Sequence, residues 1–250
     1  ARISFFFTNV NGTDSGNGVV IVPANSQIAK FINDAPFNSG NNVQGTFTFS
    51  SDIPVSIIAL RGFTNERGEF LLATLPVTDL AGATPTGTQV LSLYASGSGW
   101  ATQVILINSA DTAMTGGIEF YSSGSSEAAG SLTNRVAYSI APRSSQKIAT
   151  PEIAAITSTG SVRVVPDSTD SAPVSLAMLS FKPSSVTITA AGVPATRGNA
   201  FRMYAELFGV PGREGSIQTG VAIANTSATP AVASLELFRL DGTPAGTTAS

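Results

Sequence analysis

The chain has neither cysteine nor histidine among its 250 residues. Without cysteine there are no disulfides, no thiolate nucleophile and no sulfur ligands for a metal. Without histidine the chain lacks the commonest general base, the commonest zinc ligand and the central residue of a Ser-His-Asp triad. These absences exclude the most familiar routes to hydrolytic and metal-dependent catalysis, and we expect no enzyme activity.

Charge is also scarce. Charged residues make up 12% of the chain, against about 25% in an average globular protein. The 13 basic side chains are scattered singly and the formal net charge is −3, so we expect no nucleic-acid partner and no attraction to an anionic membrane surface. No stretch approaches the ~18–20 consecutive apolar residues of a membrane span, so we expect no membrane insertion. The chain opens with Ala1 rather than Met, which indicates a removed leader or a cut from a longer protein.

The chain does have the alternation of apolar and polar residues that is typical of β-strands. Residues 46–49 (TFTF) and 161–164 (SVRV) alternate with a period of two, as half-buried strands do. Residues 55–60 are rich in β-branched side chains and predict a more fully buried strand. Turn signals separate the strands at about 8–12-residue spacing, which is typical of a β-sandwich. Residues 102–107 and 117–121, on either side of a turn at 108–114, are predicted to form a hairpin.

The sequence also repeats itself. Two segments return after 119 residues, namely 23–29 (PANSQIA) as 142–149 (PRSSQKIA), and 54–57 (PVSI) as 173–176 (PVSL). Two more return at slightly shorter separations, namely 93–95 (LYA) as 203–205 (MYA), and 104–108 (VILIN) as 221–225 (VAIAN). One segment occurs three times, as residues 3–6 (ISFF), 118–121 (IEFY) and 235–238 (LELF).

The repeat divides the chain into three parts, joined by small-residue, proline-containing linkers at 81–87 and 193–198. Residues 88–195 are predicted to form a complete β-sandwich. Residues 1–80 are a second sandwich that lacks its opening hairpin, and residues 200–250 are the opening strands of a further one. We therefore predict an all-β fold of two Ig-like antiparallel sandwiches in tandem, because each period of about 117 residues is an ordinary sandwich size.

The first and last parts are complementary portions of one domain type. They could close on each other within a chain, close between neighbouring chains, or belong to a longer tandem array. The closure has one strand too many, and a surplus strand at a sheet edge invites pairing with another chain. The predicted assembly residues lie on these duplicated terminal strands: Ile3, Phe5, Phe7, Leu235, Leu237 and Leu240. The alternative is that both segments are ordinary strands of their local sheet.

Four segments carry a resemblance to a known repeat: residues 100–108 (WATQVILIN), 160–166 (GSVRVVP), 215–225 (GSIQTGVAIAN) and 60–70 (LRGFTNERGEF). The chain resembles a β-sandwich repeat that occurs in tandem in large, uncharacterised secreted proteins of soil bacteria such as Acidobacteria. The resemblance covers nearly the whole chain and implies export, tandem arrangement and an Ig-like sandwich. It transfers no catalytic or binding residues.

Candidate ligand sites are few. Trp100 has Ile217 at the matched position of the repeat and is the best candidate for stacking on a carbohydrate, such as a surface polysaccharide. Asp167 and Asp170 could offer oxygens to calcium, but two carboxylates are too few for the six to eight ligands that it takes. An ordinary polar turn is the simpler interpretation, and no cofactor is expected.

Three other groups of polar residues have simple structural interpretations. The charges between Arg61 and Glu69 are those of a hairpin tip with solvated ion pairs. Asn108 and Asn225 open equivalent turns, where a side-chain amide bonds its own backbone. Glu119 and Glu236 are matched carboxylates inside strands, where they are expected to line a polar face.

The composition and the repeat together predict an extracellular or cell-surface structural module, the subunit of a filament, a surface layer or an adhesin stalk. Its partners would be copies of itself or further repeats of the same chain. The mechanism would be strand complementation or end-to-end packing. The alternative is a carbohydrate-binding or adhesive accessory domain of a secreted protein.

Overall fold

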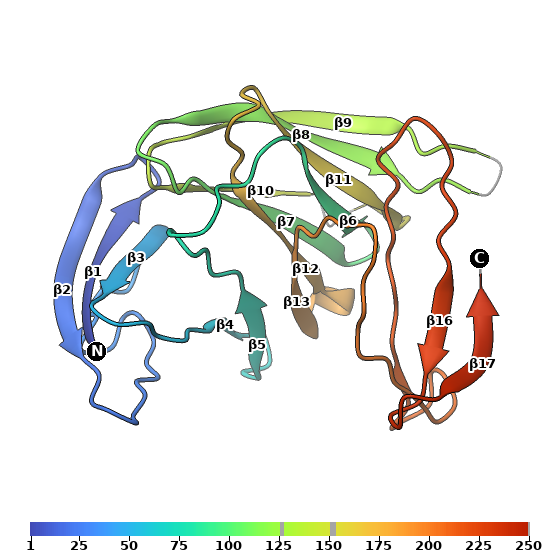
Figure 1. Cartoon of the computed structure of the whole chain (residues 1–250), viewed down its shortest axis with the longest axis horizontal. Helices are drawn as coiled ribbons and strands as arrows, with labels where there is room; N and C mark the ends of the chain where they lie inside the picture. The colour runs from blue at the N-terminus through green and yellow to red at the C-terminus, as the bar shows by residue number, and fades with distance from the viewer. Residues whose placement is uncertain (126–127, 151–153, 250) are drawn as a thin grey trace.

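The structure is a computed structural model that describes residues 1–125, 128–150 and 154–249. It confirms the predicted all-β fold (Figure 1), since one short 3-10 turn, η1 (Pro183–Ser185), is the sole helical element among these residues. No helix in the described part of the chain is long and apolar enough to cross a membrane. The strands, in chain order, are β1 (Arg2–Asn9), β2 (Asp14–Ile21), β3 (Gly45–Ser51), β4 (Ala59–Thr64), β5 (Phe70–Leu75), β6 (Gln89–Ser96), β7 (Trp100–Ile107), β8 (Met114–Ser122), β9 (Leu132–Ile140), β10 (Ser145–Ala149), β11 (Ser158–Pro166), β12 (Val174–Phe181), β13 (Thr189–Pro194), β14 (Leu207–Phe208), β15 (Ile217–Gln218), β16 (Leu235–Phe238) and β17 (Pro244–Ala249).

Strands β6 to β13 form a sandwich of two four-stranded antiparallel sheets. One sheet has the order β10-β7-β12-β13 and the other has the order β6-β11-β8-β9. The alternation of apolar and polar residues in β11 gives this strand one face towards the core. Val162 and Val164 are fully buried, while Ser161 and Arg163 lie on the other face. We call residues 88–195 the middle sandwich.

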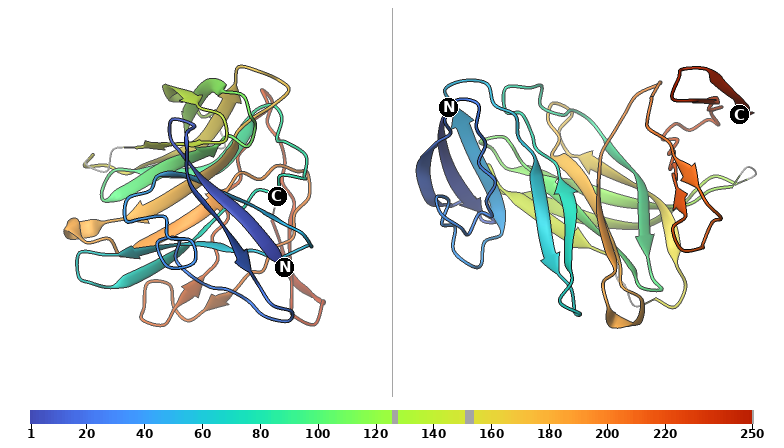
Figure 2. Two further views of the ribbon diagram at one scale, coloured as in Figure 1. Left: turned by 90° about the vertical axis from the view of Figure 1, so that its left-hand side faces the viewer. Right: turned by 90° about the horizontal axis from the view of Figure 1, so that it is seen from below.

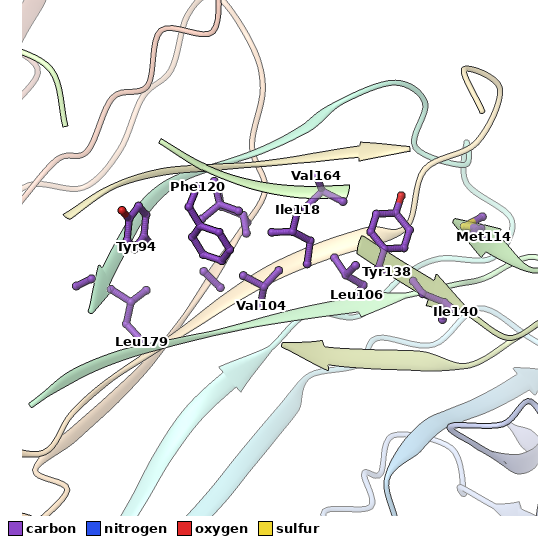
Figure 3. Packing of buried hydrophobic residues seen from close by; sticks show 14 residues of the cluster. Tyr94, Val104, Leu106, Met114, Ile118, Phe120, Tyr138, Ile140, Val164 and Leu179 are labelled. Carbon is purple, nitrogen blue, oxygen red and sulfur yellow. The ribbon is translucent and has the colours of Figure 1, made fainter. Parts of the chain in front are cut away.

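The core of the middle sandwich lies between these two sheets. Figure 3 shows side chains from both layers meeting, with Val104 and Leu106 of β7 facing Ile118 and Phe120 of β8. Tyr94 and Phe120 meet edge to face with ring centroids 5.3 Å apart, an arrangement that aromatic pairs favour. The closed sandwich is therefore held by apolar burial from every one of its long strands.

The predicted hairpin over residues 102–121 is wrong. β7 pairs with β10 and β12, whereas β8 pairs with β11 and β9 in the opposite sheet. The chain between them crosses from one layer to the other. β6 and β7 are likewise divided between the two sheets, and a single bridge between Gly97 and Trp100 joins them at the corner. These two opening strands therefore connect the two layers of the sandwich.

The remaining strands form smaller sheets on either side of the middle sandwich. The first part of the chain holds the sheet β2-β1-β3 and the separate pair β4-β5, and the last part holds the pairs β14-β15 and β16-β17. Figures 1 and 2 place β1–β3 and β16–β17 on opposite sides of the middle sandwich. We call residues 1–80 the N-terminal unit and residues 201–249 the C-terminal segment.

Candidate assembly surfaces

Hydrogen bonds show that the C-terminal segment has the local geometry of the opening strands of the middle sandwich. The Asn108 side chain donates from Nδ2 to the Thr112 carbonyl at 2.7 Å and accepts at Oδ1 from the Ala110 N–H at 2.9 Å. Asn225, 117 residues later, makes the same two bonds, to the Thr229 carbonyl at 2.8 Å and from the Ser227 N–H at 2.9 Å.

The corner before this turn is repeated as well. The Thr102 hydroxyl accepts from the Ala95 N–H at 2.9 Å and donates to its carbonyl at 2.8 Å. Thr219, again 117 residues later, makes the same pair of bonds with Glu206, at 2.8 and 3.1 Å. The C-terminal segment therefore contains a counterpart of β7 at a fixed separation of 117 residues.

The turn between β1 and β2 is duplicated between β16 and β17. The Asn9 N–H donates to the Thr13 carbonyl at 2.9 Å, and 230 residues later the Arg239 N–H donates to the Thr243 carbonyl at 2.8 Å. Gly12 and Gly242 have φ values of 80° and 82°, in the left-handed region that glycine adopts without strain. β16-β17 is thus a structural copy of β1-β2.

The N-terminal unit repeats part of the middle sandwich, strand for strand. Its sheet β2-β1-β3 has the order of β9-β8-β11, and β4-β5 corresponds to β12-β13. Two equivalent glycines align β1 and β3 with β8 and β11. A Cβ at Gly45 would overlap the Thr8 carbonyl oxygen, just as a Cβ at Gly160 would overlap the Tyr121 carbonyl oxygen. By this criterion Phe5 and Phe7 correspond to Ile118 and Phe120, two residues away from the match that the sequence suggests for β1 and β8. A shift of two keeps the same residues facing inward, so sequence patterns do not distinguish the two alignments.

The N-terminal unit has no counterparts of β6 and β7. β3 therefore lies at a free edge of its sheet, whereas β11 lies between β6 and β8. Residues 26–30 repeat the sequence of β10 and residues 55–58 repeat the start of β12, yet neither segment is a strand. In the middle sandwich both pair with β7. Similar sequences thus form strands in the middle sandwich, where β7 is present to pair with them, and form no strand in the N-terminal unit, where a counterpart of β7 is absent.

The missing strands leave apolar side chains uncovered. Ile58 is 70% exposed, whereas its counterpart Ala177 in β12 is fully buried. On the neighbouring layer, by contrast, the aromatic rings of β1 and β3 pack on one another and on Phe37, with Phe7 and Phe47 centroids 4.9 Å apart and Phe37 against Phe5 at 5.4 Å, so that Phe5 and Phe7 are buried. The N-terminal unit is an open sandwich, and we call its uncovered face the acceptor face.

The C-terminal segment exposes the complementary part. Ile223 is 64% exposed, although its counterpart Leu106 is fully buried in the core. The other large apolar side chains of the counterparts of β6 and β7 are also exposed: Phe201, Met203, Tyr204, Leu207, Phe208, Ile217 and Val221. Two complementary surfaces of one sandwich thus lie uncovered at different ends of one chain.

The six predicted assembly residues are placed in two different ways. Ile3, Phe5 and Phe7 are buried, because β1 is the central strand of its sheet and pairs with both β2 and β3. The prediction that they form a surplus strand at a sheet edge is therefore wrong, and they are core residues of the N-terminal unit. Leu235 and Leu237 are exposed on β16, and Leu240 at the following turn is 94% exposed.

The N-terminal unit is joined to the middle sandwich by direct contacts. Ala73 of β5 packs with Leu176 and Met178 on the outer face of β12. Asn65 donates from Nδ2 to the Thr187 carbonyl at 2.9 Å, and the Glu66 carboxylate accepts from the Thr187 N–H at 2.8 Å.

Glu66 also forms an ion pair with Lys182, whose Nζ lies 3.0 Å from Oε1. These bonds lower the pKa of the Glu66 carboxyl from 4.5 to about 2, with the Thr187 N–H as the largest cause. The hairpin tip at 65–69 forms as predicted, but sequence reasoning missed that it contacts the next unit. The signal was present, because at the 119-residue separation Ser185 and Ile188 stand in place of Glu66 and Glu69.

The other candidate residues have structural contacts. Trp100 is half-buried and stacks on Phe181 with centroids 4.6 Å apart, which occupies one ring face. Glu119 faces Arg135 at 3.8 Å, whereas Glu236 is exposed on β16. Asp170 accepts from the Thr169 hydroxyl at 3.3 Å in an exposed loop. Within the described ranges no group of three or more acidic side chains is arranged to hold a metal ion.

Comparison of the chain with models of protein families, with curated proteins and with solved structures finds no match. The internal repeat is therefore the template for interpreting the two open parts, since the middle sandwich shows which strand covers which face.

Proposed function

We propose that the chain is an extracellular structural module, the subunit of a filament, a surface layer or an adhesin stalk. The units are Ig-like sandwiches in tandem, and assembly occurs by completion of the open ones. The proposed role is structural and involves no catalysis. Its partners are copies of the chain or further repeats of the same kind.

The observation that carries the proposal is one closed sandwich between two open and complementary parts. The acceptor face exposes Ile58, and the C-terminal segment exposes Val221 and Ile223. Burying a side chain of this size contributes about 1.5–3 kcal/mol. Exposed apolar surface and an unpaired strand edge, such as that of β3, are typical of an interaction site.

The composition supports an extracellular location. Only 12% of the residues are charged, and the exposed positions of β9 include Thr133, Asn134 and Ser139, as expected of the secreted β-proteins that the chain resembles. If the chain is exported, its exposed faces would meet those of other copies outside the cell.

Negative-stain microscopy of the purified chain, together with sedimentation, tests the proposal. We expect regular linear assemblies built from the 25.5 kDa chain. Deletion of residues 1–9 removes the central strand of the N-terminal unit and should abolish assembly. The middle sandwich should remain folded in that variant, as reported by the fluorescence of Trp100, the single tryptophan of the chain. Assembly that survived the deletion, or a chain that stayed monomeric at high concentration, would contradict the proposal.

A further inference from the structure

We infer that residues 201–224 of a second copy of the chain complete the N-terminal unit, by adding one strand to each of its two layers. This inference rests on the proposed function, because it names the partner of the acceptor face. The strand that corresponds to β7 would enter between residues 26–30 and 55–58, and the strand that corresponds to β6 would lie along the free edge of β3.

The middle sandwich provides the template for the first strand. β7 lies between β10 and β12, with Leu106 opposite both Gln146 and Ser175, and Val104 opposite both Ile148 and Ala177. Leu106 and Val104 face the core between the two sheets.

The same register can be applied to the N-terminal unit, because the repeat separations of 117 and 119 residues show which residues are equivalent. The separation of 117 residues, set by Thr219 and Asn225, makes Ile223 the counterpart of Leu106 and Val221 that of Val104. The repeat of 119 residues makes Ser56 and Ile58 the counterparts of Ser175 and Ala177. In the completed unit Ile223 therefore lies opposite Ser56, and Val221 lies opposite Ile58.

The chemistry of the segment suits this place. Residues 215–225 (GSIQTGVAIAN) contain no charged side chain, as a central strand buried on one face and packed on the other requires. Residues 1–80 carry four basic and six acidic side chains, whereas residues 201–224 carry two basic and two acidic ones. The docking segment has no net charge, so the acidic N-terminal unit would not repel it.

The geometry points to a second copy rather than to closure within one chain. The sheet β2-β1-β3 and the C-terminal segment lie on opposite sides of the middle sandwich (Figure 2). Each copy therefore offers one acceptor face and one strand pair, and joining them head to tail is a heterologous contact that leaves a free acceptor face and a free strand pair for further copies. β16-β17 stays outside the completed unit, because β1-β2 already occupies the equivalent place.

Disulfide cross-linking between two single-cysteine variants tests the inference, and the absence of native cysteine keeps the experiment clean. Ser56→Cys is mixed with Ile223→Cys under mild oxidation, and dimers are measured on a non-reducing gel. Because each variant has one cysteine, closure within a chain cannot produce the bond between these two positions. Directly opposite residues on paired strands are close enough for a disulfide.

The matched control mixes Ser56→Cys with Ala222→Cys. A shift of one residue turns the side chain to the opposite face of the sheet, so we expect the Ile223 pair to give at least roughly tenfold more mixed dimer than the control pair. Trp100 fluorescence, unchanged in all three variants, reports that the middle sandwich is folded.

The outcomes separate this inference from the proposed function. Preferential cross-linking of Ser56 to Ile223 supports both. Regular assemblies in which the Ala222 pair cross-links equally well, or in which neither does, overturn the inference and leave the structural role standing. A chain that neither assembles nor cross-links overturns both. A double variant that carries Ser56→Cys and Ile223→Cys and stays monomeric with an internal disulfide would also overturn both.

Discussion

The Glu66 carboxylate accepts a hydrogen bond from the backbone N–H of Thr187 at 2.8 Å, across 121 residues of sequence. Glu66 thereby links the tip of the β4-β5 hairpin to the loop before β13. Asn65 contributes a second bond to the same residue, through the Thr187 carbonyl. This junction fixes how the N-terminal unit sits on the middle sandwich.

The junction is predicted to weaken in acid. The pKa of Glu66 is lowered from 4.5 to about 2 in the folded chain, so the unfolded or released form binds the proton more readily between these values. The stabilisation is present above pH 4.5 and is lost as the pH falls towards 2. The protection of the Thr187 amide against hydrogen exchange, relative to its intrinsic exchange rate at each pH, should fall over this range, and Glu66→Gln should lower this protection at neutral pH.

Glu69→Gln is the matched control for that experiment. The Glu69 carboxylate bonds Asn65 and Arg67 within its own turn, so its loss should leave the exchange of the Thr187 amide unchanged. Equal effects of the two substitutions would show that the whole hairpin tip, rather than Glu66, makes the junction.

Tyr138→Phe is predicted to stabilise the middle sandwich by about 1 kcal/mol. The Tyr138 hydroxyl is buried with no hydrogen-bond partner among the described residues, and Phe removes this unsatisfied group. Burial, with a smaller effect of Asp167, raises the pKa of Tyr138 from 10.0 to about 12. The unfolded chain therefore ionises first, and stability falls from pH 10 to 12.

Urea unfolding followed by Trp100 fluorescence measures both effects of this substitution. The alkaline loss of stability should shrink in Tyr138→Phe. Substitution of the exposed Tyr204 by Phe should change the free energy of unfolding by less than about 0.5 kcal/mol. A Tyr138→Phe variant less stable than the parent would show that the hydroxyl has a partner.

Gly160→Ala is predicted to destabilise the middle sandwich by about 1–3 kcal/mol, as overpacking does. Its Cβ would overlap the Tyr121 carbonyl oxygen, and backbone cannot move aside as a flexible side chain can. Gly220→Ala serves as the control, because no atom among the described residues lies near the added methyl group. Thermal unfolding should separate the two variants, and equal midpoints would contradict the register assigned to β8 and β11.

Leu106→Ala and Ile223→Ala form a repeat-matched pair. Leu106 is fully buried, so its truncation should cost the middle sandwich about 2–5 kcal/mol. Ile223 is exposed in the single chain, so its truncation should leave monomer stability within about 0.5 kcal/mol. It should nevertheless weaken assembly, as measured by sedimentation over a range of concentrations. Unchanged assembly of Ile223→Ala would count against its burial in a second copy.

Much of the fold follows from the sequence because strands and turns are local. The alternation at residues 46–49 and 161–164 became β3 and β11, and the turns at Asn108 and Asn225 form with the same bonds. Turn geometry depends on a few neighbouring residues, and so it survives even where the sheet around it is missing.

What could not be predicted depends on partners distant in sequence. Residues 26–30 have the sequence of a strand but lack a neighbour to pair with, because backbone pairing needs both strands. β7 and β8 look like a hairpin, yet alternation does not reveal which layer each strand joins. The buried place of Phe5 and Phe7 required the pairing of β1 with β2 and β3.

The small apolar cluster of Ala73, Leu176 and Met178, together with the bonds at Thr187, has a mechanical consequence. Neighbouring units in contact through side chains and backbone swivel less freely than units on a free linker do. Bending or torsion at the junction would have to separate these contacts. A series of units joined in this way would behave as a rigid rod, so that the distance it spans grows in direct proportion to the number of units.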